Sequence, residues 1–424
     1  MTVRRFDAAA WRQSPLSRGR FDLAGFGSER AAVAEICALV RDEGDAALRE
    51  LGLRFDGWAP AQGEGFEVAR EELESSSAGL PAADRSALEF AAARIRDFHE
   101  RQLPQPASAG RASMRMVARP VARAGVYAPG GRAAYPSTVL MTAIPARVAG
   151  VAEVVLATPP RRDGSVPAAI LAAARIAGVD AVYRVGGAQA IAALAYGTES
   201  IPRVDVVAGP GNVYVTLAKR EVFGAVGVDG IAGPTEVVVL ADDEARPDFV
   251  AADLAAQLEH DPMAWGVLVT DSERLAARAV EELEDLLGGL ERAEIIRQAN
   301  CCVIVARDMD EGVRIVDDFA PEHLLIVAAD AESLASRVRN AGAIFVGPYA
   351  TVPLGDYTAG PNHTLPTSGA ARYASPLGVH TFIKRTNILA LGREDVETLR
   401  DATLRLAALE GLGGHAHAVE VRLE

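Results

Sequence analysis

After residue 120, short apolar runs alternate regularly with longer, alanine-rich segments. Runs of four to six apolar residues predict buried strands, and longer segments with helical periodicity predict helices. The first series predicts a strand at 154–157, a helix at 167–177, a strand at 181–184, a helix at 188–196, a strand at 204–208 and a helix at 213–223. This βαβ order predicts a parallel sheet covered by helices.

The same alternation continues to residue 346. It predicts strands at 236–240, 266–270, 302–306, 324–327 and 343–346, and helices at 247–260, 273–287, 308–318 and 332–340. Two such series predict two Rossmann-like, doubly wound parallel-sheet domains of the α/β class, with small N- and C-terminal segments outside them.

The flanking segments have other patterns. Residues 28–41 have the spacing of an amphipathic helix, with Ser28 as the expected N-cap, and residues 82–102 repeat that spacing. Residues 104–110 are rich in proline and small residues, and residues 347–378 in Gly, Pro, Thr and Ser, so both predict loops. Residues 392–411 predict a helix, and the last ten residues a strand.

Composition limits the class of protein. The chain has 424 residues, long enough for two domains, and a net charge of -14, which argues against a nucleic-acid partner and against an anionic membrane surface. Its three cysteines form no CxxC pair, so a reducing cytoplasm is the expected compartment. The basic start is followed by no apolar core, so it does not have the pattern of a signal peptide.

Three glycine-rich segments fall where strands of the first series end. They are Gly125 to Gly131, Gly186-Gly187-Ala-Gln189 and Ala208-Gly-Pro-Gly-Asn212. Glycine lets the backbone approach a phosphate, and the helix that follows offers amide donors, so the three loops together favour a nucleotide site. The GxGxxG fingerprint is absent, so NAD would bind here in a non-standard mode, and plain βα turns are the alternative for each loop.

The histidines are few and unevenly placed, since six of the seven lie beyond residue 259. Gln257 and His260 share a face of the predicted helix that Pro262 ends, and Asp356 lies in a loop rich in Gly and Pro. Imidazole with amide or carboxylate oxygen suits Zn²⁺, with His363 or His415 as a fourth ligand. A single histidine is more often structural, so the hypothesis depends on the combination.

Glu322 and His323 form a second candidate group, directly after Pro321 and before a predicted strand. A histidine near its ordinary pKa acts as a general base, and a glutamate activates water. Neighbours in an extended segment point to opposite sides, so the pair needs a turn to act on one substrate. Without such a turn, the two residues would simply begin the strand and have no catalytic role.

These motifs, in this order, resemble the histidinol dehydrogenase family from about residue 25 to the C-terminus. The matching runs are 125–141, 185–192, 208–212, 232–236, 320–324 and 355–367. The resemblance implies oxidation of L-histidinol to L-histidine through the aldehyde with two NAD⁺, which completes histidine biosynthesis. It also implies a homodimer with one Zn²⁺ per subunit, in which terminal segments reach the partner's site.

With the resemblance, we divide the chain into four parts. These are an N-terminal segment (1–24), a discontinuous main α/β domain with the metal and acid–base residues (25–125 and 234–375), a second Rossmann-like domain on the NAD side (126–233) and a C-terminal helical segment (376–424).

The resemblance also implies residue roles. Zinc ligands would be Gln257, His260, Asp356 and His415, and the NAD site would include Tyr127, Gln189 and Asn212. His323 would take the alcohol proton, and Glu322 would activate water to hydrate the aldehyde. The substrate would contact the zinc ligands and His323, together with Thr235, His363 and Glu410. Thr235 stands where family members often have Ser, which keeps the hydroxyl and adds a methyl group.

Three other functions are open from sequence. One is a related NAD-dependent dehydrogenase of another small polar alcohol, and the presence of Glu410, His363 and all four candidate ligands favours histidinol over it. Another is a zinc-dependent hydrolase in which Glu322 activates water, and this predicts no NAD binding. The third is a binding protein without activity, which does not explain a full set of candidate catalytic residues.

Overall fold

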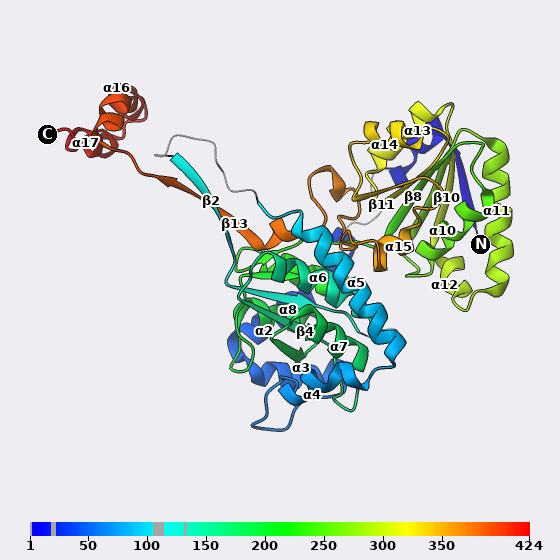
Figure 1. The fold of residues 1–424 in the computed structure, drawn as a ribbon, viewed down its shortest axis with the longest axis horizontal. Helices are drawn as coiled ribbons and strands as arrows, with labels where there is room; N and C mark the ends of the chain where they lie inside the picture. Colours follow the sequence, from blue (N-terminus) through cyan, green and yellow to red (C-terminus); the bar gives the residue numbers. More distant parts are fainter. Residues whose placement is uncertain (1, 18–22, 105–113, 131–133) are drawn as a thin grey trace. The chain divides into compact units, whose positions relative to one another are not determined.

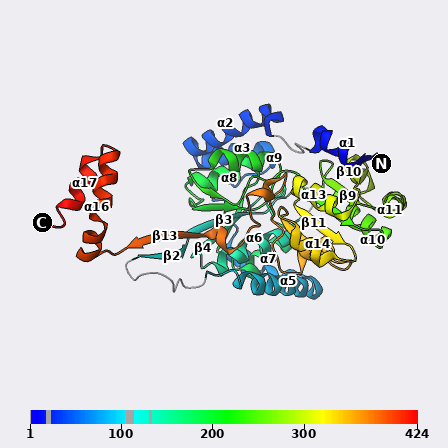
Figure 2. The same cartoon turned by 90° about the horizontal axis from the view of Figure 1, so that it is seen from above.

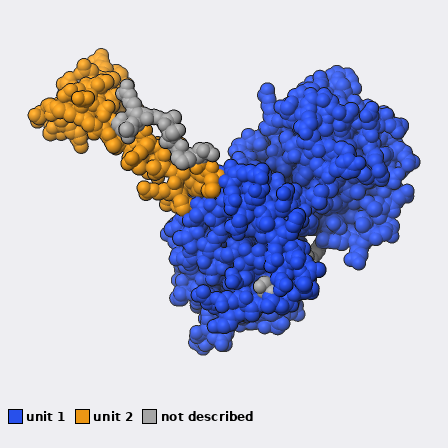
Figure 3. Space-filling model, viewed as in Figure 1, with its two compact units in different colours: residues 1–102, 121–382 blue, residues 103–120, 383–424 orange. Residues whose placement is uncertain are grey.

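The computed structural model of the chain describes residues 2–17, 23–104, 114–130 and 134–424. It forms two compact units, residues 1–102 with 121–382 and residues 103–120 with 383–424 (Figures 1 and 3). The first unit holds two separate parallel sheets with helices on both faces, so the predicted α/β class with Rossmann-like sheets is confirmed. Apart from Pro104, the loop predicted at 104–110 lies outside the described residues.

The first sheet contains the strands of the first βα series. Its order is β5-β4-β3-β6-β7, and every neighbouring pair is parallel. The strands are β3 (Arg123–Tyr127), β4 (Glu153–Thr158), β5 (Ala181–Arg184), β6 (Val206–Ala208) and β7 (Gly227–Val228). The connecting helices are α6 (Pro136–Val148), α7 (Ala168–Ala177), α8 (Gly187–Tyr196) and α9 (Val213–Val222). Each predicted element of this series is present within a few residues of its expected bounds.

The helices that precede this sheet in sequence also pack on it. They are α2 (Gly27–Glu43), α3 (Asp45–Phe55), α4 (Arg70–Ser75) and α5 (Ala82–Glu100). Figure 2 shows α2, α3, α8 and α9 on one face of the sheet and α5, α6 and α7 on the other. The apolar stripe of α2 lies in one buried cluster with α8 and α9. Val68 donates its N–H to the carbonyl of Val182, which adds residues 66–68 beside β5.

Residues of α2 and α3 pack in the core of the first sheet, whereas the expected division assigns residues 25–125 to the domain of the metal and acid–base residues; that division stays a prediction. The apolar stripe of α2 was predicted correctly, but Ser28 is not an N-cap. The helix begins one residue earlier, at Gly27, and the Ser28 hydroxyl donates to Glu29.

The second sheet has the order β1-β10-β9-β8-β11-β12 and is parallel throughout. Its strands are β1 (Val3–Asp7), β8 (Glu236–Ala241), β9 (Trp265–Thr270), β10 (Asn300–Val305), β11 (His323–Val327) and β12 (Ala343–Val346). The sequence predicts all of them except β1, which is short and has only two apolar residues.

Helices cover both faces of this sheet (Figure 1). Val237 and Val239 of β8 face one cluster, and Val238 and Leu240 face the other, as expected for a strand buried on both sides. The first cluster holds residues of α10 (Pro247–Leu258), α11 (Glu273–Leu286) and α12 (Ala293–Gln298). The second holds residues of α1 (Ala8–Gln13), α13 (Met309–Phe319) and α14 (Ala331–Arg337).

Two local predictions are corrected. The segment 347–378 is not loop throughout, because it contains α15 (Val352–Tyr357), where Thr351 precedes a proline in the first turn. The C-terminal strand prediction is wrong, because residues 413–420 form α17 (Gly413–Glu420). Gly411, at φ 70°, lets the chain reverse after α16 (Arg393–Leu409), so the two helices form a hairpin.

The second unit contains this helical hairpin and an antiparallel pair of strands, β2 (Met114–Pro120) and β13 (Ile383–Leu389). Among the residues of this unit that the structure describes, Ala407 alone is buried. Within the described part of the chain, every helix is too short or too polar to cross a membrane.

Candidate functional site

The acid–base candidates lie at the amino edge of the second sheet. Glu322 precedes β11 and His323 is its first residue, while Thr235 and Glu236 stand at the start of the neighbouring strand β8. Ala320 adopts a left-handed conformation, with φ 50°, so α13 ends there and the chain turns into the strand. Both candidate side chains are almost fully buried, at 6% and 4% exposed.

Glu322 is held by two donors on a single oxygen. Its Oε2 accepts a bond from the Thr235 hydroxyl and a bond of 2.8 Å from the Glu236 backbone N–H. The Thr235 hydroxyl in turn accepts a bond from Nε2 of Gln257. Thr235 therefore joins the candidate water-activating carboxylate to a candidate metal ligand, a connection that the sequence does not reveal.

His323 lies between two carboxylates. Its Nδ1 donates to the Glu236 carbonyl at 3.1 Å and lies 3.5 Å from Oε2 of Glu322. Its Nε2 lies 3.6 Å from Oδ1 of Asp356. Burial lowers the pKa of His323, but the charges of Glu322 and Asp356 outweigh it and raise the pKa to about 10.

Three of the four candidate zinc ligands belong to the first unit. Gln257 lies in the last turn of α10, His260 two residues after that helix, and Asp356 in α15. Burial raises the pKa of Asp356, but its interaction with His323 and the nearby imidazoles of His363 and His260 lower it overall. Its carboxylate thus stays charged among three histidines.

The hydrogen bonds of these side chains leave free the donor atoms that could hold a metal ion. Because Nε2 of Gln257 donates to Thr235, the oxygen Oε1 is the group that the amide offers to a metal. Because Nδ1 of His260 donates to the Ala256 carbonyl at 3.0 Å, its Nε2 is the nitrogen it offers. Amide oxygen, imidazole nitrogen and carboxylate suit Zn²⁺. Across the described ranges, no three His, Cys, Asp or Glu side chains are grouped closely enough to hold a metal by themselves.

A buried aspartate connects two of the elements that carry these candidates. Asp253, one helical turn before Gln257 in α10, accepts a bond from the hydroxyl of Thr351, the N-cap residue of α15. It is 6% exposed, and burial raises its pKa. This bond ties the helix of Gln257 to the helix of Asp356, and nothing local in the sequence indicated it.

His363 lies in the segment that follows α15, the helix of Asp356. Its Nδ1 donates to the Asp356 carbonyl at 2.8 Å, and its Nε2 lies 3.5 Å from the Thr138 hydroxyl of α6. Burial lowers the pKa of His363, which leaves a neutral ring. The site thus combines residues from the second sheet with one from a helix of the first.

The remaining two candidates are in the second unit. Glu410 ends α16 and His415 lies in the first turn of α17, and both side chains are exposed.

The glycine loops lie at the carboxyl edge of the first sheet, where open α/β sheets bind ligands. Tyr127 ends β3, and its hydroxyl accepts a bond of 3.0 Å from the Gly187 N–H at the start of α8. Burial raises the pKa of Tyr127 to about 12. Gln189 is buried in α8, and Asn212 is exposed and caps α9. Gly131 of the first loop lies outside the described residues.

A buried ion pair fixes the third glycine loop. Lys219 and Asp229 are paired at 4% and 3% side-chain exposure. Nζ of Lys219 donates to the Gly209 carbonyl at 2.9 Å, and Asp229 accepts from the Gly209 N–H at 2.8 Å. Beside this loop is a cavity of about 340 Å³, which residues 364–366 also line. The cavity joins a glycine loop to the segment directly after His363.

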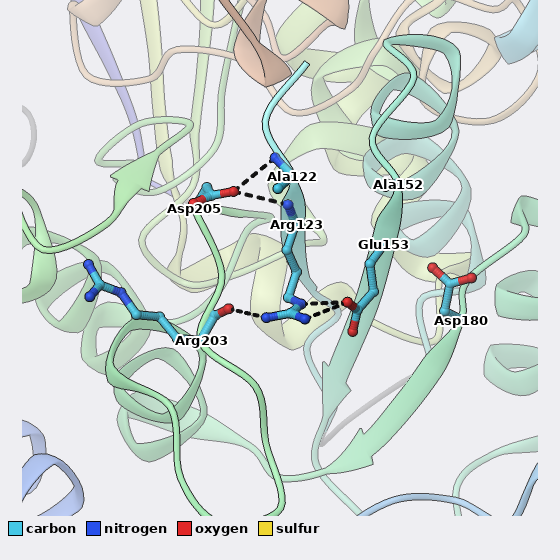
Figure 4. A pocket seen from close by; sticks show the side chains of 7 residues that line it. All are labelled: Ala122, Arg123, Ala152, Glu153, Asp180, Arg203 and Asp205. Atoms are coloured by element: carbon cyan, nitrogen blue, oxygen red, sulfur yellow. Dashed lines mark hydrogen bonds and ion pairs between the residues drawn. The ribbon is translucent and has the colours of Figure 1, made fainter. Parts of the chain in front are cut away.

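A larger cavity of about 560 Å³ lies at the opposite, amino edge of the first sheet (Figure 4). Its charged groups are engaged with one another or with backbone. Arg123 pairs with Glu153, and Asp205 accepts from the N–H groups of Ala122 and Arg123. These contacts hold the starts of neighbouring strands together, so this cavity is a structural feature of the sheet edge.

Comparisons with known proteins agree on one family. The family profile described as histidinol dehydrogenase matches residues 25–423. A histidinol dehydrogenase of Prochlorococcus marinus is 48% identical over 400 residues, which cover 93% of this chain and 90% of that protein. One of Moorella thermoacetica is 48% identical over 401 residues, covering 93% and 94%. The crystal structure of histidinol dehydrogenase from Elizabethkingia anophelis matches with a TM-score of 0.90 at 32% identity, covering 99% of this chain and 98% of that one.

Proposed function

This chain belongs to the histidinol dehydrogenase family of oxidoreductases, and from that premise we propose that it is a zinc-dependent enzyme oxidising L-histidinol to L-histidine with two NAD⁺. The observation that carries the proposal is the buried group of His323, Glu322 and Asp356 beside Gln257. A base, a water-activating carboxylate and two metal ligands meet there, and the two oxidations need all of them.

His323 takes the proton of the substrate alcohol as hydride leaves the carbon. The bond from its Nδ1 to the Glu236 carbonyl supports this role, since in the deprotonated ring it fixes the tautomer and makes Nε2 the proton acceptor. Among the described side chains, Nε2 is one of the few buried polar atoms without a hydrogen-bond partner. A substrate hydroxyl would satisfy it.

Glu322 activates the water that hydrates the aldehyde. Its Oε2 is occupied by Thr235 and the Glu236 N–H, and these two donors hold the carboxylate in one orientation. A general base must lie within hydrogen-bond reach of its proton, and fixed positioning supports that. Burial of both catalytic residues also supports retention of the aldehyde between the two oxidations.

Gln257, His260, Asp356 and His415 would hold the zinc ion. When bound, zinc supplies a positive charge that holds the amino and imidazole nitrogens of the substrate and offsets the Asp356 carboxylate beside His323. Thr235 orients the Gln257 amide, and Asp253 anchors the start of α15, so both ligand elements have second contacts that support a metal site.

NAD⁺ would bind at the carboxyl edge of the first sheet, near Tyr127, Gln189 and Asn212. The amino end of α8 and the glycine conformations support it, because Gly187 and Gly209 have φ of 64° and 125°. His363 and Glu410 would contact the substrate together with Thr235.

We further propose that the active form is a homodimer in which the C-terminal segment completes the partner's site. The second unit exposes many large apolar side chains, which a monomer would leave in water. They are Met114, Met116, Leu389, Leu391, Leu399, Leu406, Leu409, Leu412 and Val421. Met263, Leu354 and Tyr357, close in sequence to the zinc candidates, are also exposed. A partner subunit would cover these exposed side chains.

The test is NADH formation by the purified protein with L-histidinol and NAD⁺, before and after chelation and zinc restoration. We expect two NADH per histidinol, loss of activity with the chelator and recovery with zinc. A zinc-loaded, NAD-binding protein that leaves histidinol unchanged would instead point to another small polar alcohol. A protein that binds no NAD⁺ would remove the proposal altogether.

A further inference from the structure

Asn362, the residue before His363, is almost fully buried and engages three elements. Its Nδ2 donates to the Met141 carbonyl of α6 at 2.6 Å and lies 3.4 Å from Nε2 of His99 in α5. Its Oδ1 accepts a bond of 2.9 Å from the Thr364 N–H of its own loop. At 5% exposure, this amide has each of its polar atoms in a protein contact.

His99 is completely buried, at 0% exposed. Its Nδ1 donates to the Ile95 carbonyl at 2.7 Å, so Nε2 carries the lone pair that receives the Asn362 N–H. Burial lowers the pKa of His99 and outweighs the opposing effect of its backbone contacts with Ile95 and Leu377, so the ring is neutral. No catalytic role described above uses this histidine.

Two further contacts dock the same loop on α5. Arg94 donates to the Ala359 carbonyl at 3.2 Å. Gly360 has a φ of 114°, and a Cβ placed on it would lie 2.8 Å from the Arg94 carbonyl oxygen. The loop therefore approaches α5 so closely that a side chain is excluded at residue 360.

The loop docked in this way carries the functional candidates. His363 comes directly after Asn362 and donates to the carbonyl of Asp356 at 2.8 Å. The same stretch of α6 that contacts Asn362 through Met141 also presents the Thr138 hydroxyl to His363. A shift of Asn362 would therefore move His363 at one end of the loop and affect Asp356 at the other.

We propose that His99 and Asn362 are positioning residues, whose buried hydrogen bond holds the loop of residues 356–364 so that His363 meets the substrate. The proposal rests on the proposed function, because it assigns His363 to substrate binding. A purely apolar contact would bury the loop equally well, whereas a satisfied polar pair fixes one position. Neither residue touches the substrate in this scheme, so neither is catalytic.

The test compares three variants of the full-length, zinc-loaded protein. His99→Leu removes the acceptor and leaves the Asn362 N–H unsatisfied. His99→Gln keeps an acceptor and a donor on one buried side chain. Thr142→Val is the matched control, because its buried hydroxyl in α6 bonds only to backbone carbonyls of its own helix.

We expect His99→Leu to raise the KM for L-histidinol about tenfold, the effect of one unsatisfied buried donor, while the KM for NAD⁺ changes less than about twofold. His99→Gln should recover most of the lost affinity. Thr142→Val should lower the melting temperature without raising the histidinol KM. Equal KM values in His99→Leu and Thr142→Val would overturn the proposal, as would a loss of kcat alone.

Hydrogen–deuterium exchange gives a readout that does not depend on activity. Amides of residues 356–364 should exchange faster in His99→Leu than in Thr142→Val, with the strands of the second sheet unchanged. A wild-type protein without activity on histidinol would remove the proposed function, and the exchange result would still decide whether the His99–Asn362 contact holds the loop. If amide exchange is faster throughout the protein in both variants, His99 contributes only to the core and does not position the loop.

Discussion

At the residue scale, Glu322 and His323 are neighbours in sequence with different surroundings. Glu322 receives two donors on one oxygen, and His323 offers Nε2 toward Asp356. We expect His323→Asn to lower the rate of alcohol oxidation by about 10²- to 10⁴-fold, the usual contribution of a general base. Glu322→Gln should impair oxidation of the aldehyde more than its formation. Single-turnover rates started from L-histidinol and from L-histidinal measure the two steps.

The matched control for this pair is Thr235→Ser, which keeps the hydroxyl bond to Glu322 and removes only a methyl group. It should retain both half-reactions. Equal losses of the two half-reactions in Glu322→Gln would contradict the division of labour between the neighbours.

The carboxylates around His323 also give a pH dependence of stability. In the metal-free protein its pKa is raised from 6.5 to about 10, so the folded state binds the proton more tightly than the unfolded state. This contribution is fully present below pH 6.5 and is lost as the pH rises through about 10. Melting temperatures of chelated protein should fall across that window, and His323→Gln should flatten the fall. An unchanged slope in His323→Gln would show that other groups cause it.

The sequence predicts residues of this site only where they belong to a recognisable motif. Glu322, His323 and Asp356 lie in such motifs, and the structure brings them together around one imidazole. His99 and Asp253 have no local signal, because a polar residue in a helix looks the same in sequence whether it is buried against a loop or exposed to solvent. Their partners, Asn362 and Thr351, are far away in sequence, so only the fold reveals the contacts.

At the element scale, short continuous apolar runs correctly predicted the strands that are buried on both faces. It failed for elements without a buried run. β2 and β13 form an antiparallel pair whose residues are mostly exposed, so their sequences contain no continuous apolar run. β1 was missed because a short edge strand with two arginines does not resemble a buried one.

The edge strand β1 gives an element-scale prediction. Trp11, in the helix after it, is 1% exposed and packs against Phe6 and Phe319, with ring centroids 5.6 and 6.2 Å away. Trp11→Ala should lower the free energy of unfolding by about 3–5 kcal/mol, as expected for a fully buried large aromatic side chain. Urea unfolding at fixed protein concentration measures this. Phe55→Ala, at a half-exposed position, should change the free energy of unfolding far less. Similar losses in both variants would show that Trp11 of α1 does not hold β1 and α1 on the sheet.

At the scale of the whole molecule, the second unit has almost no core of its own. Ala407 is its one buried residue among those described, and four leucines of the helical hairpin are exposed. Glu410 and His415 belong to this hairpin, while the acid–base pair belongs to the first unit. If the hairpin completes the partner's site, each active site combines the acid–base pair of one subunit with Glu410 and His415 of the other.

Mixing two inactive variants tests this arrangement. His323→Asn disables the first unit's contribution and His415→Ala disables the hairpin's. When subunits exchange, some dimers contain one chain of each variant. If each hairpin (here called the tail) serves the partner's site, such a mixed dimer regains one intact site. That site combines the first unit of the His415→Ala chain with the tail of the His323→Asn chain. Random pairing then gives about a quarter of wild-type activity, because half of the dimers are mixed and each has one good site of two. If each tail serves its own chain, every site carries one lesion and the mixture stays inactive. The single variants, carried through the same exchange alone, must show no recovery, and their dimer content by analytical ultracentrifugation separates a lost site from a lost dimer.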